Sequence, residues 1–264
     1  MEIDLPPLPT QRRIAAILSA YDDLIENNTR RIKILEEMAQ LLYREWFVHF
    51  RFPGHEGVKM VKGVPEGWEV KRIGEIAEVN ASSVKKGEEP TEINYVDIAS
   101  VSTGQINQIT ILPFESAPGR ARRIVKHGDI IWSCVRPNRK SYSLILNPQP
   151  NLIVSTGFAV ITAKQASYTY LYHALTTDDF VSYLTNHATG AAYPAVTATD
   201  FEKAKILFPA KEVLDSFHAV VADMYKQRHV LSQKNANLRR TRDLLLPRLV
   251  SGEVDVSKIE IGIE

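Results

Sequence analysis

The chain has 264 residues, 44% hydrophobic and 24% charged, and its formal net charge is +1. This length suits one large or two small domains with a buried core. Its single cysteine, Cys134, excludes an intramolecular disulfide and a thiolate-rich metal site. No apolar run reaches the roughly 20 residues of a membrane helix, and the N-terminus lacks a signal-peptide pattern, so we expect a cytoplasmic protein.

Residues 1–9 look like the end of a domain rather than its beginning. Residues 3–5 resemble the tail of a strand, and the prolines at positions 6, 7 and 9 disfavour a helix. Thr10 then stands where a helix N-cap is expected. We therefore interpret residues 1–9 as a strand remnant with a Pro-rich lead-in, and we expect a further domain to precede such a junction.

A long helix is predicted over residues 10–52. Between Gln11 and Val48 there is no glycine or proline, and seam positions recur in alternating steps of four and three. That spacing is typical of a coiled coil, whereas a helix on a globular core has a broader apolar stripe. The predicted seam residues are Ile14, Leu18, Tyr21, Ile25, Asn28, Ile32 and Leu35.

A second long helix is predicted over residues 209–250, as an internal repeat of the first. A shift of 203 positions maps the first seam, continued to Ala39, Leu42 and Trp46, onto the second, which ends at Leu249, and it maps Pro6 onto Pro209. Its apolar seam residues are Phe217, Val221, Met224, Leu231, Leu238 and Leu245, and its polar ones are Arg228, Asn235 and Arg242. Polar seam residues reduce stability but can fix the register and the partner.

Pro247 lies near the end of the second helix, and we expect it to end or kink that helix one turn early. Residues 251–264 then form a C-terminal tail. An alternative interpretation of both segments is that they are two amphipathic helices of one bundle, without a rod between them.

The middle of the chain has a different sequence pattern. Residues 53–64 are predicted to be a Gly-containing flexible linker, and residues 65–208 a mixed α/β domain of short strands bounded by Gly, Pro and Asn. One helix is predicted over residues 168–187. A capping box from Thr199 to Glu202 is expected to open a short turn before the last strand.

The segment junctions resemble those of a known family. LPPLPTQRRIAAIL and WFVHF are similar to the helical region of type I restriction-modification DNA specificity subunits. VPEGWEVKRIGEIAEV resembles the start of their target recognition domain, and GAAYPAVTATDFEKAKILFP resembles its end. The resemblance implies an α+β chain in which one mixed recognition domain is flanked by two long helices that form an antiparallel coiled coil. Because complete members have two such domains, this chain resembles a half subunit.

The resemblance also implies partners. Double-stranded DNA would be bound by the recognition domain, and type I methyltransferase subunits would dock on the helices and bring S-adenosylmethionine; this chain itself would bind no cofactor. An endonuclease subunit would be an optional further partner. A second copy of this chain is expected to supply the other recognition domain.

A basic segment is the first candidate DNA-binding surface. Residues 116–140 contain seven Lys or Arg against one acid, Asp129, and such clustering suits contact with phosphates and guanine. In the loop PNRKS, Asn138 could pair with adenine and Arg139 with guanine. The alternative is a solvated basic loop. The candidates are Arg120, Arg122, Arg123, Lys126, Arg136, Asn138, Arg139 and Lys140.

A second candidate surface is NHATGAAYPAVT, residues 186–197. Its small residues permit close backbone approach, while Thr189 and Tyr193 offer hydroxyls and an aromatic face. An ordinary loop after a helix C-cap is an equal alternative. We interpret Ser155 and Thr156 as structural.

Motifs of catalysis are missing from the sequence. We find no G-x-S-x-G, H-E-x-x-H, P-loop or dinucleotide-binding pattern, and the seven histidines are not grouped at metal-ligand spacing. Glu69-Val70-Lys71 matches the end of a nuclease motif but is interpreted as structural. We expect a non-catalytic DNA specificity subunit without a metal. The alternative function is a coiled-coil interaction scaffold that does not read DNA.

Overall fold

The computed structural model describes residues 6–256, and the chain divides into two compact units. The first, called here the helical pair, lies within residues 1–39 and 223–264, and the second, called the middle unit, comprises residues 40–222. Helices α1 (Leu8–Tyr43) and α6 (Lys211–Val250) contribute residues to both. Within the described part, no helix is long and apolar enough to cross a membrane. The strand remnant predicted over residues 3–5 lies outside the described residues.

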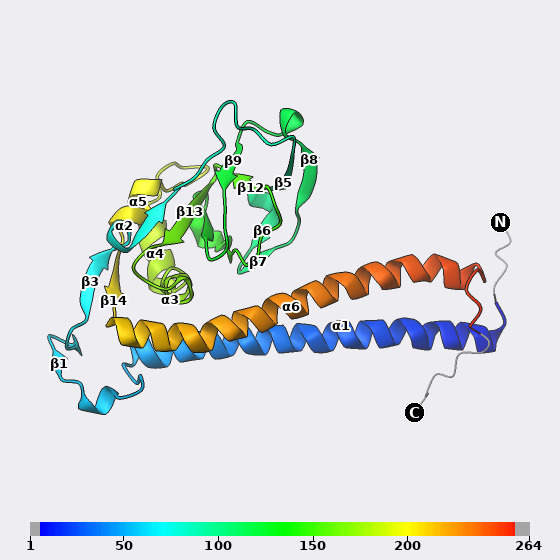
Figure 1. Ribbon diagram of the computed structural model, residues 1–264, viewed down its shortest axis with the longest axis horizontal. Coiled ribbons are helices and arrows are strands. Elements are labelled where there is room, and N and C mark those ends of the chain that lie inside the picture. Colours follow the sequence, from blue (N-terminus) through cyan, green and yellow to red (C-terminus); the bar gives the residue numbers. More distant parts are fainter. Residues whose placement is uncertain (1–5, 257–264) are drawn as a thin grey trace. The chain divides into compact units, whose positions relative to one another are not determined.

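In the helical pair, α1 and α6 lie side by side and run antiparallel (Figure 1). Arg242 in α6 forms an ion pair with Asp22 in α1. Two heptads earlier in α6, Arg228 Nε lies 2.6 Å from Glu36 Oε1. The earlier α1 residue, Asp22, pairs with the later α6 residue, Arg242, and the later α1 residue, Glu36, pairs with the earlier α6 residue, Arg228. The two helices therefore run antiparallel.

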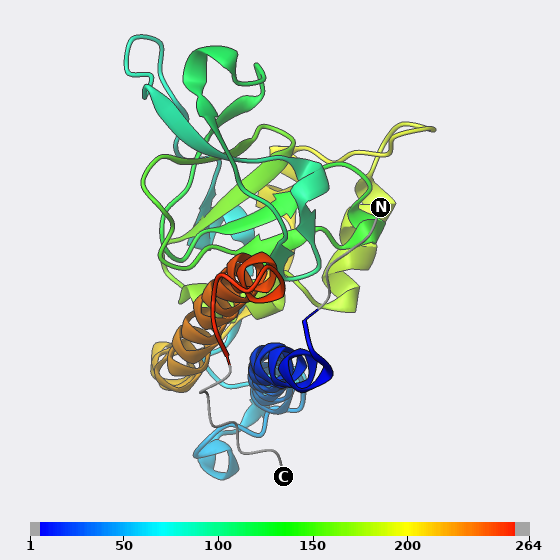
Figure 2. The same ribbon diagram turned by 90° about the vertical axis from the view of Figure 1, so that its right-hand side faces the viewer.

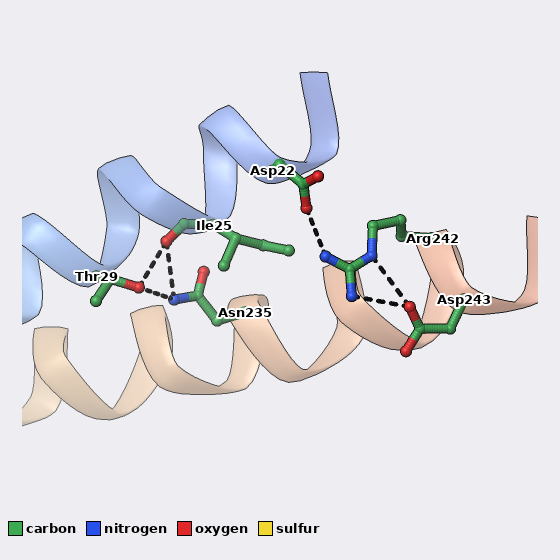
Figure 3. Close-up of polar contacts among 6 residues, drawn as sticks. All are labelled: Asp22, Ile25, Thr29, Asn235, Arg242 and Asp243. Carbon is green, nitrogen blue, oxygen red and sulfur yellow. Dashed lines mark hydrogen bonds and ion pairs between the residues drawn. The ribbon is translucent and has the colours of Figure 1, made fainter. Parts of the chain in front are cut away.

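A buried amide, that of Asn235, lies between Arg228 and Arg242 along α6, and Figure 3 shows it beside the Asp22–Arg242 pair. Asn235 is 3% exposed; its Nδ2 donates to Thr29 Oγ1 at 3.1 Å and to the Ile25 carbonyl at 3.3 Å. Its Oδ1 accepts a hydrogen bond from Asn28 Nδ2 at 2.9 Å. The amide thus has partners on α1 for both of its ends, which a buried polar group requires.

The predicted seam positions lie on the inner sides of the two helices. At one end of the helical pair, Ile14 packs with Leu249 and Val256 in a small apolar cluster, so the predicted tail contains a buried residue, Val256. The buried seam residues are Ile14, Ile25, Phe217, Val221, Leu231 and Asn235. The half-buried ones are Leu18, Tyr21, Asn28, Ile32, Leu35, Met224, Arg228, Leu238, Arg242 and Leu245.

The ends of α1 differ from the predicted 10–52. The helix begins at Leu8 and includes Pro9 in its first turn, where a proline deprives the helix of no hydrogen bond, so Thr10 is not the N-cap. Regular helix ends at Tyr43 and is followed by a π-helical turn, Arg44–Val48. Phe50 then takes a φ of 57°, which ends the helical path before residue 52.

Pro247 does not end α6, which begins at Lys211 rather than 209 and continues through the proline to Val250. A proline this close to the C-terminus removes one backbone hydrogen bond. The last turn is held by the Ser251 N–H, which donates to the Pro247 carbonyl at 3.0 Å, and by the buried side chain of Leu249.

The middle unit contains two four-stranded sheets. The first has the order β11-β10-β13-β4 and is antiparallel throughout. The second has the order β8-β5-β12-β9, in which only β5 and β12 are parallel. The strands of the first are β4 (Ala77–Val79), β10 (Ile130–Ser133), β11 (Tyr142–Leu144) and β13 (Phe158–Ala163); those of the second are β5 (Glu92–Val96), β8 (Thr110–Pro113), β9 (Ala121–Ile124) and β12 (Leu152–Ser155).

The main core lies between these sheets. Val96 and Val154 of the second sheet pack with Ile131 and Val160 of the first. On its other face the second sheet has a smaller cluster that includes Ile93. Because β10, β12 and β13 are almost fully buried, they are nearly continuous apolar runs rather than alternating ones.

Two-stranded pairs complete the middle unit. β3 (Glu69–Arg72) pairs antiparallel with β14 (Lys205–Phe208), so its first and last long strands are neighbours. The predicted flexible linker differs from the structure, because residues 60–65 form a hairpin of β1 (Met60–Val61) and β2 (Val64–Pro65). The middle unit also contains the β6 (Val101–Ser102) and β7 (Gln105–Ile106) hairpin and the short helix α2 (Ile73–Ile76).

The helix predicted over residues 168–187 is two helices, α3 (Tyr168–Ala174) and α4 (Asp178–His187). The break has two causes. The Leu175 carbonyl accepts a hydrogen bond from buried Trp132 Nε1 at 3.0 Å, and Thr177 Oγ1 caps α4 by accepting from the Phe180 N–H at 3.2 Å.

The capping box of the last short helix lies two residues earlier in the chain than predicted. α5 (Ala198–Lys203) opens with a box formed by Thr197 and Asp200, not by Thr199 and Glu202. The Val196 N–H donates to the Cys134 carbonyl at 2.9 Å, which keeps Val196 outside the helix. The helix starts directly afterwards, so Thr197 is the N-cap.

Aromatic side chains pack together in the middle unit, where α1 ends and α6 begins. Phe47 lies 4.9 Å from Phe217 and 4.7 Å from Tyr170 between ring centroids. His173 is buried beside Tyr43, at 5.5 Å, and this burial lowers the pKa of His173 to about 3. The imidazole is therefore neutral at physiological pH.

Candidate nucleic-acid interface

The structure brings two predicted surfaces together. We call them the Arg136 loop (residues 136–140) and the Tyr193 loop (residues 189–195). Val135 forms a β-bridge with Ala195, and the Arg136 N–H donates to the Pro194 carbonyl at 2.7 Å. Figure 2 shows the yellow loop before α5 projecting away from the strands. The two loops therefore form one continuous surface at one end of β10.

The side chain of Arg136 joins the two loops. Its Nη2 donates to the Ala192 carbonyl at 3.2 Å, and its guanidinium carbon lies 4.6 Å from the centroid of the Tyr193 ring. A guanidinium over an aromatic face is attracted by the ring's negative charge density. Arg136 is half-buried as a residue, while its hydrogen bond to Ala192 is exposed.

The Arg136 loop has an uncommon backbone. Residues 137–139 form a 3₁₀ turn, and the residues on either side, Arg136 and Lys140, have φ values of 52° and 54°. A non-glycine residue in this left-handed region costs on the order of 1–2 kcal/mol. The surrounding contacts must therefore hold the turn in place.

Lys140 supplies one such contact. Its Nζ lies 2.7 Å from Oδ1 of Asp178, the first residue of α4. This hydrogen bond and the positive charge of Lys140 lower the pKa of the Asp178 carboxyl. The pair is partly exposed, with 40% of the Lys140 side chain and 89% of the Asp178 side chain accessible.

Four residues of this surface are exposed to solvent. Asn138 and Arg139 lie on the exposed turn, and within residues 6–256 their side chains have no hydrogen bond or ion pair. Tyr193 is 69% exposed. Thr189 is also exposed, and its backbone pairs with Ala195 through two hydrogen bonds of 2.9 Å.

Arg120 lies near this surface but is already paired. Its Nη2 lies 2.7 Å from Asp97 Oδ2, which also accepts from Tyr95 Oη at 3.0 Å. The hydrogen bond that Arg120 donates to Tyr95 and the negative charge of Asp97 raise the pKa of Arg120. The basic segment is thus partly neutralised by acids from outside it, Asp97 for Arg120 and Asp178 for Lys140.

The other three basic candidates do not join the two loops. Arg122 stacks on Phe114, with 4.9 Å between its guanidinium carbon and the ring centroid. Arg123 donates to Ser83 Oγ at 3.3 Å, and its buried Nε has no acceptor among the described residues. Lys126 is exposed in the turn between β9 and β10, at the opposite end of β10 from Arg136.

Thr156, which the sequence argument interpreted as structural, lies in an exposed turn. Ser155 is fully buried and its Oγ accepts from the Gly157 N–H, but Thr156 is exposed. The Thr156 N–H donates to the Arg120 carbonyl at 2.7 Å, while the Gly157 carbonyl accepts from the Cys134 N–H at 2.8 Å. This turn is thus bonded to Arg120 on one side and to Cys134 on the other. A Thr-Gly pair between two predicted strands is the signal that could have placed it in a turn.

The structure also shows where the residues considered for catalysis lie. No group of three His, Cys, Asp or Glu side chains in the described residues is placed to hold a metal ion. Lys71 of the nuclease-like triplet pairs with Glu69 at 3.2 Å and lies 4.3 Å from the ring centroid of Phe208, within the β3–β14 pair. Burial raises the pKa of the Cys134 thiol to about 11, which disfavours a thiolate nucleophile.

Comparison with known proteins is consistent across sequence and structure. The family model described as "Type I restriction modification DNA specificity domain" matches residues 1–37 and 65–228. The MjaIX specificity subunit of Methanocaldococcus jannaschii is 27% identical over 275 residues, which cover 98% of this chain and 62% of that protein. The chain thus spans about three fifths of the length of that relative.

Two solved structures share this architecture. The HsdS subunit from Thermoanaerobacter tengcongensis superposes with a TM-score of 0.52 at 25% identity, covering 75% of this chain and 52% of that one. The S subunit of a type I restriction-modification system from M. genitalium gives a TM-score of 0.58 over 95% of this chain and 62% of that one; at 16% identity it is a likeness of fold alone. Since the family model matches most of the sequence, the chain belongs to the type I restriction-modification DNA specificity family.

Proposed function

We propose that this chain is a specificity subunit that reads one half of a bipartite DNA site through its middle unit. The main support is the surface formed by the Arg136 and Tyr193 loops, in a chain of a DNA specificity family. Asn138 and Arg139 have amide and guanidinium donors in solvent, and these groups match the major-groove edges of adenine and guanine. The chain has no catalytic role of its own.

The helical pair would supply geometry and docking. Its antiparallel register, fixed by the contacts of Asn235, Arg228 and Arg242, would set a constant distance along the DNA. Methyltransferase subunits would dock on it and bring S-adenosylmethionine, and an endonuclease subunit could join the same complex. The complex would act in the cytoplasm.

Two copies of the chain would complete the site. The middle unit offers one recognition surface and therefore one half-site. Two chains related by a two-fold axis would read the same half-site twice in opposite directions, which makes the target palindromic, bipartite and of fixed spacing. An asymmetric methylated target would exclude this homodimer.

Methylation-sensitive long-read sequencing tests the proposal directly. The full chain is expressed with type I methyltransferase subunits, and genomic methylation is compared with that of cells that have the same subunits and lack this chain. A methylated bipartite motif that depends on this chain is expected. No new motif, together with no salt-dependent binding of duplex DNA by the complex, would favour an interaction scaffold instead.

A further inference from the structure

We propose that the polar residues of the Arg136 loop have two different roles: Arg136 and Lys140 are positioning residues, and Asn138 and Arg139 contact the bases. Tyr193 would form the aromatic wall beside them. This inference rests on the proposed reading of DNA. It gives different roles to Arg136, Arg139 and Lys140, which a count of positive charges cannot distinguish.

The geometry of Arg136 favours a positioning role. Its guanidinium is engaged with Ala192 and Tyr193, and its own N–H is bonded to Pro194, so all three contacts go to the Tyr193 loop. The bond to Ala192 and the contact with the Tyr193 ring fix the orientation of the guanidinium within the chain, and a move towards a base edge that broke them would lose both. Holding the two loops together is the role its present contacts perform.

Lys140 has the equivalent position at the other end of the turn. Its left-handed backbone closes the 3₁₀ turn, and its Nζ is bonded to Asp178 of α4. The turn is therefore tied at one end to the Tyr193 loop and at the other to a helix. Asn138 and Arg139 lie between these ties with free side chains, as a base-reading pair requires.

Glycine substitutions test the positioning roles without changing the backbone preference. Arg136→Gly and Lys140→Gly keep a residue that adopts positive φ while removing the side-chain contact. Each variant is assayed as the full chain in the methyltransferase complex, by methylated motif and by binding to cognate and mismatched duplexes over a range of salt. Melting temperature shows whether each variant is folded.

Different patterns are expected for the two classes. Asn138→Ala and Arg139→Ala should each relax preference at one base position, by roughly tenfold to a hundredfold. Arg136→Gly should weaken discrimination at every position read by the two loops, with an unchanged salt slope. Tyr193→Ala should add little to Arg136→Gly, because both remove the same contact, whereas Tyr193→Phe keeps the ring and should leave the motif intact.

Asp178→Asn separates the two possible roles of Lys140. If Lys140 is a positioning residue, this change should reproduce the loss of cognate affinity seen with Lys140→Gly, about twofold to fivefold for a partly exposed pair. If Lys140 contacts phosphate, freeing it from Asp178 should instead strengthen binding, and Lys140→Gly should reduce the salt slope by about 0.9.

Several results would overturn the inference alone. These are relaxation of a single base position by Arg136→Gly, a shallower salt slope in either glycine variant, or tighter binding by Asp178→Asn. A wild-type complex that yields no motif and binds no duplex would overturn the proposed function, and the inference with it. The wild-type control therefore distinguishes the two failures.

Discussion

The helical pair and the two-loop surface use polar side chains in opposite ways. In the helical pair, Asn235 and Arg242 reach across to α1, and their hydrogen-bonding groups are used within the chain. On the loop surface, Asn138 and Arg139 are the same residue types, yet they point into solvent from a turn that its neighbours hold in place. The difference teaches that residue type alone does not mark an interface; the interface is where polar groups are held in position and left without an internal partner.

The largest expected effect is on the stability of the helical pair. Leu231 is 5% exposed, so Leu231→Ala should lower the free energy of unfolding by about 2–5 kcal/mol. Urea unfolding followed by circular dichroism measures this loss. The adjacent Val230 is 41% exposed, and Val230→Ala is the matched control, expected within about 0.5 kcal/mol of wild type. Equal losses for both variants would contradict the assigned seam.

Acid should act on the middle unit through His173. The folded-state pKa is about 3, below the ordinary 6.5, so the unfolded state binds a proton that the folded state does not. Stability should therefore fall as the pH drops from 6.5 towards 3, with a slope approaching about 1.4 kcal/mol per pH unit, and His173 should contribute no slope above that range.

The measurement is urea unfolding at several pH values. His173→Gln removes the titrating group and should flatten the acid limb of the profile, whatever its effect on stability at pH 7. If the variant and the wild type lose stability in parallel between pH 6.5 and 4, His173 is not the source of the acid sensitivity.

Asn235→Ala should have an intermediate effect. It removes a buried amide and leaves the Asn28 and Thr29 side chains without that partner, which is expected to cost about 1–3 kcal/mol. Replacing both Asn28 and Asn235 by Leu should recover most of this loss, because no half of the pair remains unsatisfied. If the double variant is as unstable as Asn235→Ala, the two amides stabilise the fold by more than satisfying each other's hydrogen bonds.

The smallest effect on stability is expected at the loop surface. Arg139→Ala should change the free energy of unfolding by no more than about 0.5 kcal/mol, since the side chain is exposed and makes no internal contact in the described structure. It should nevertheless weaken duplex binding. Lys126→Ala, at the far end of β10, should change neither, and a loss of binding there would extend the interface beyond the two loops.

The long helices could be foreseen because heptad spacing is a local and repeated signal. Their ends could not, because each depends on a single event: Pro9 fits a first turn, and Phe50 leaves the helical path through a positive φ. Likewise, the split between α3 and α4 depends on a hydrogen bond from Trp132, more than forty residues away in sequence.

The candidate surface could be predicted only in parts. The sequence contains Arg136 and Tyr193 as separate candidates, and nothing local shows that a bridge between Val135 and Ala195 brings them together. Charge counting also overestimates the basic segment, because Asp97 and Asp178 come to it from distant positions. Tertiary structure decides which basic side chains remain available.

The pairing of β3 with β14 has a consequence for how such chains can be altered. Glu69 is the register partner of Phe208, so the polypeptide enters and leaves the folded region between them at neighbouring points. A segment whose two ends meet can be exchanged for another of different length by recombination at two junctions, while the flanking helical sequence stays unchanged. The β3–β14 pair is thus a natural boundary for a cassette, across which new DNA specificities could be grafted.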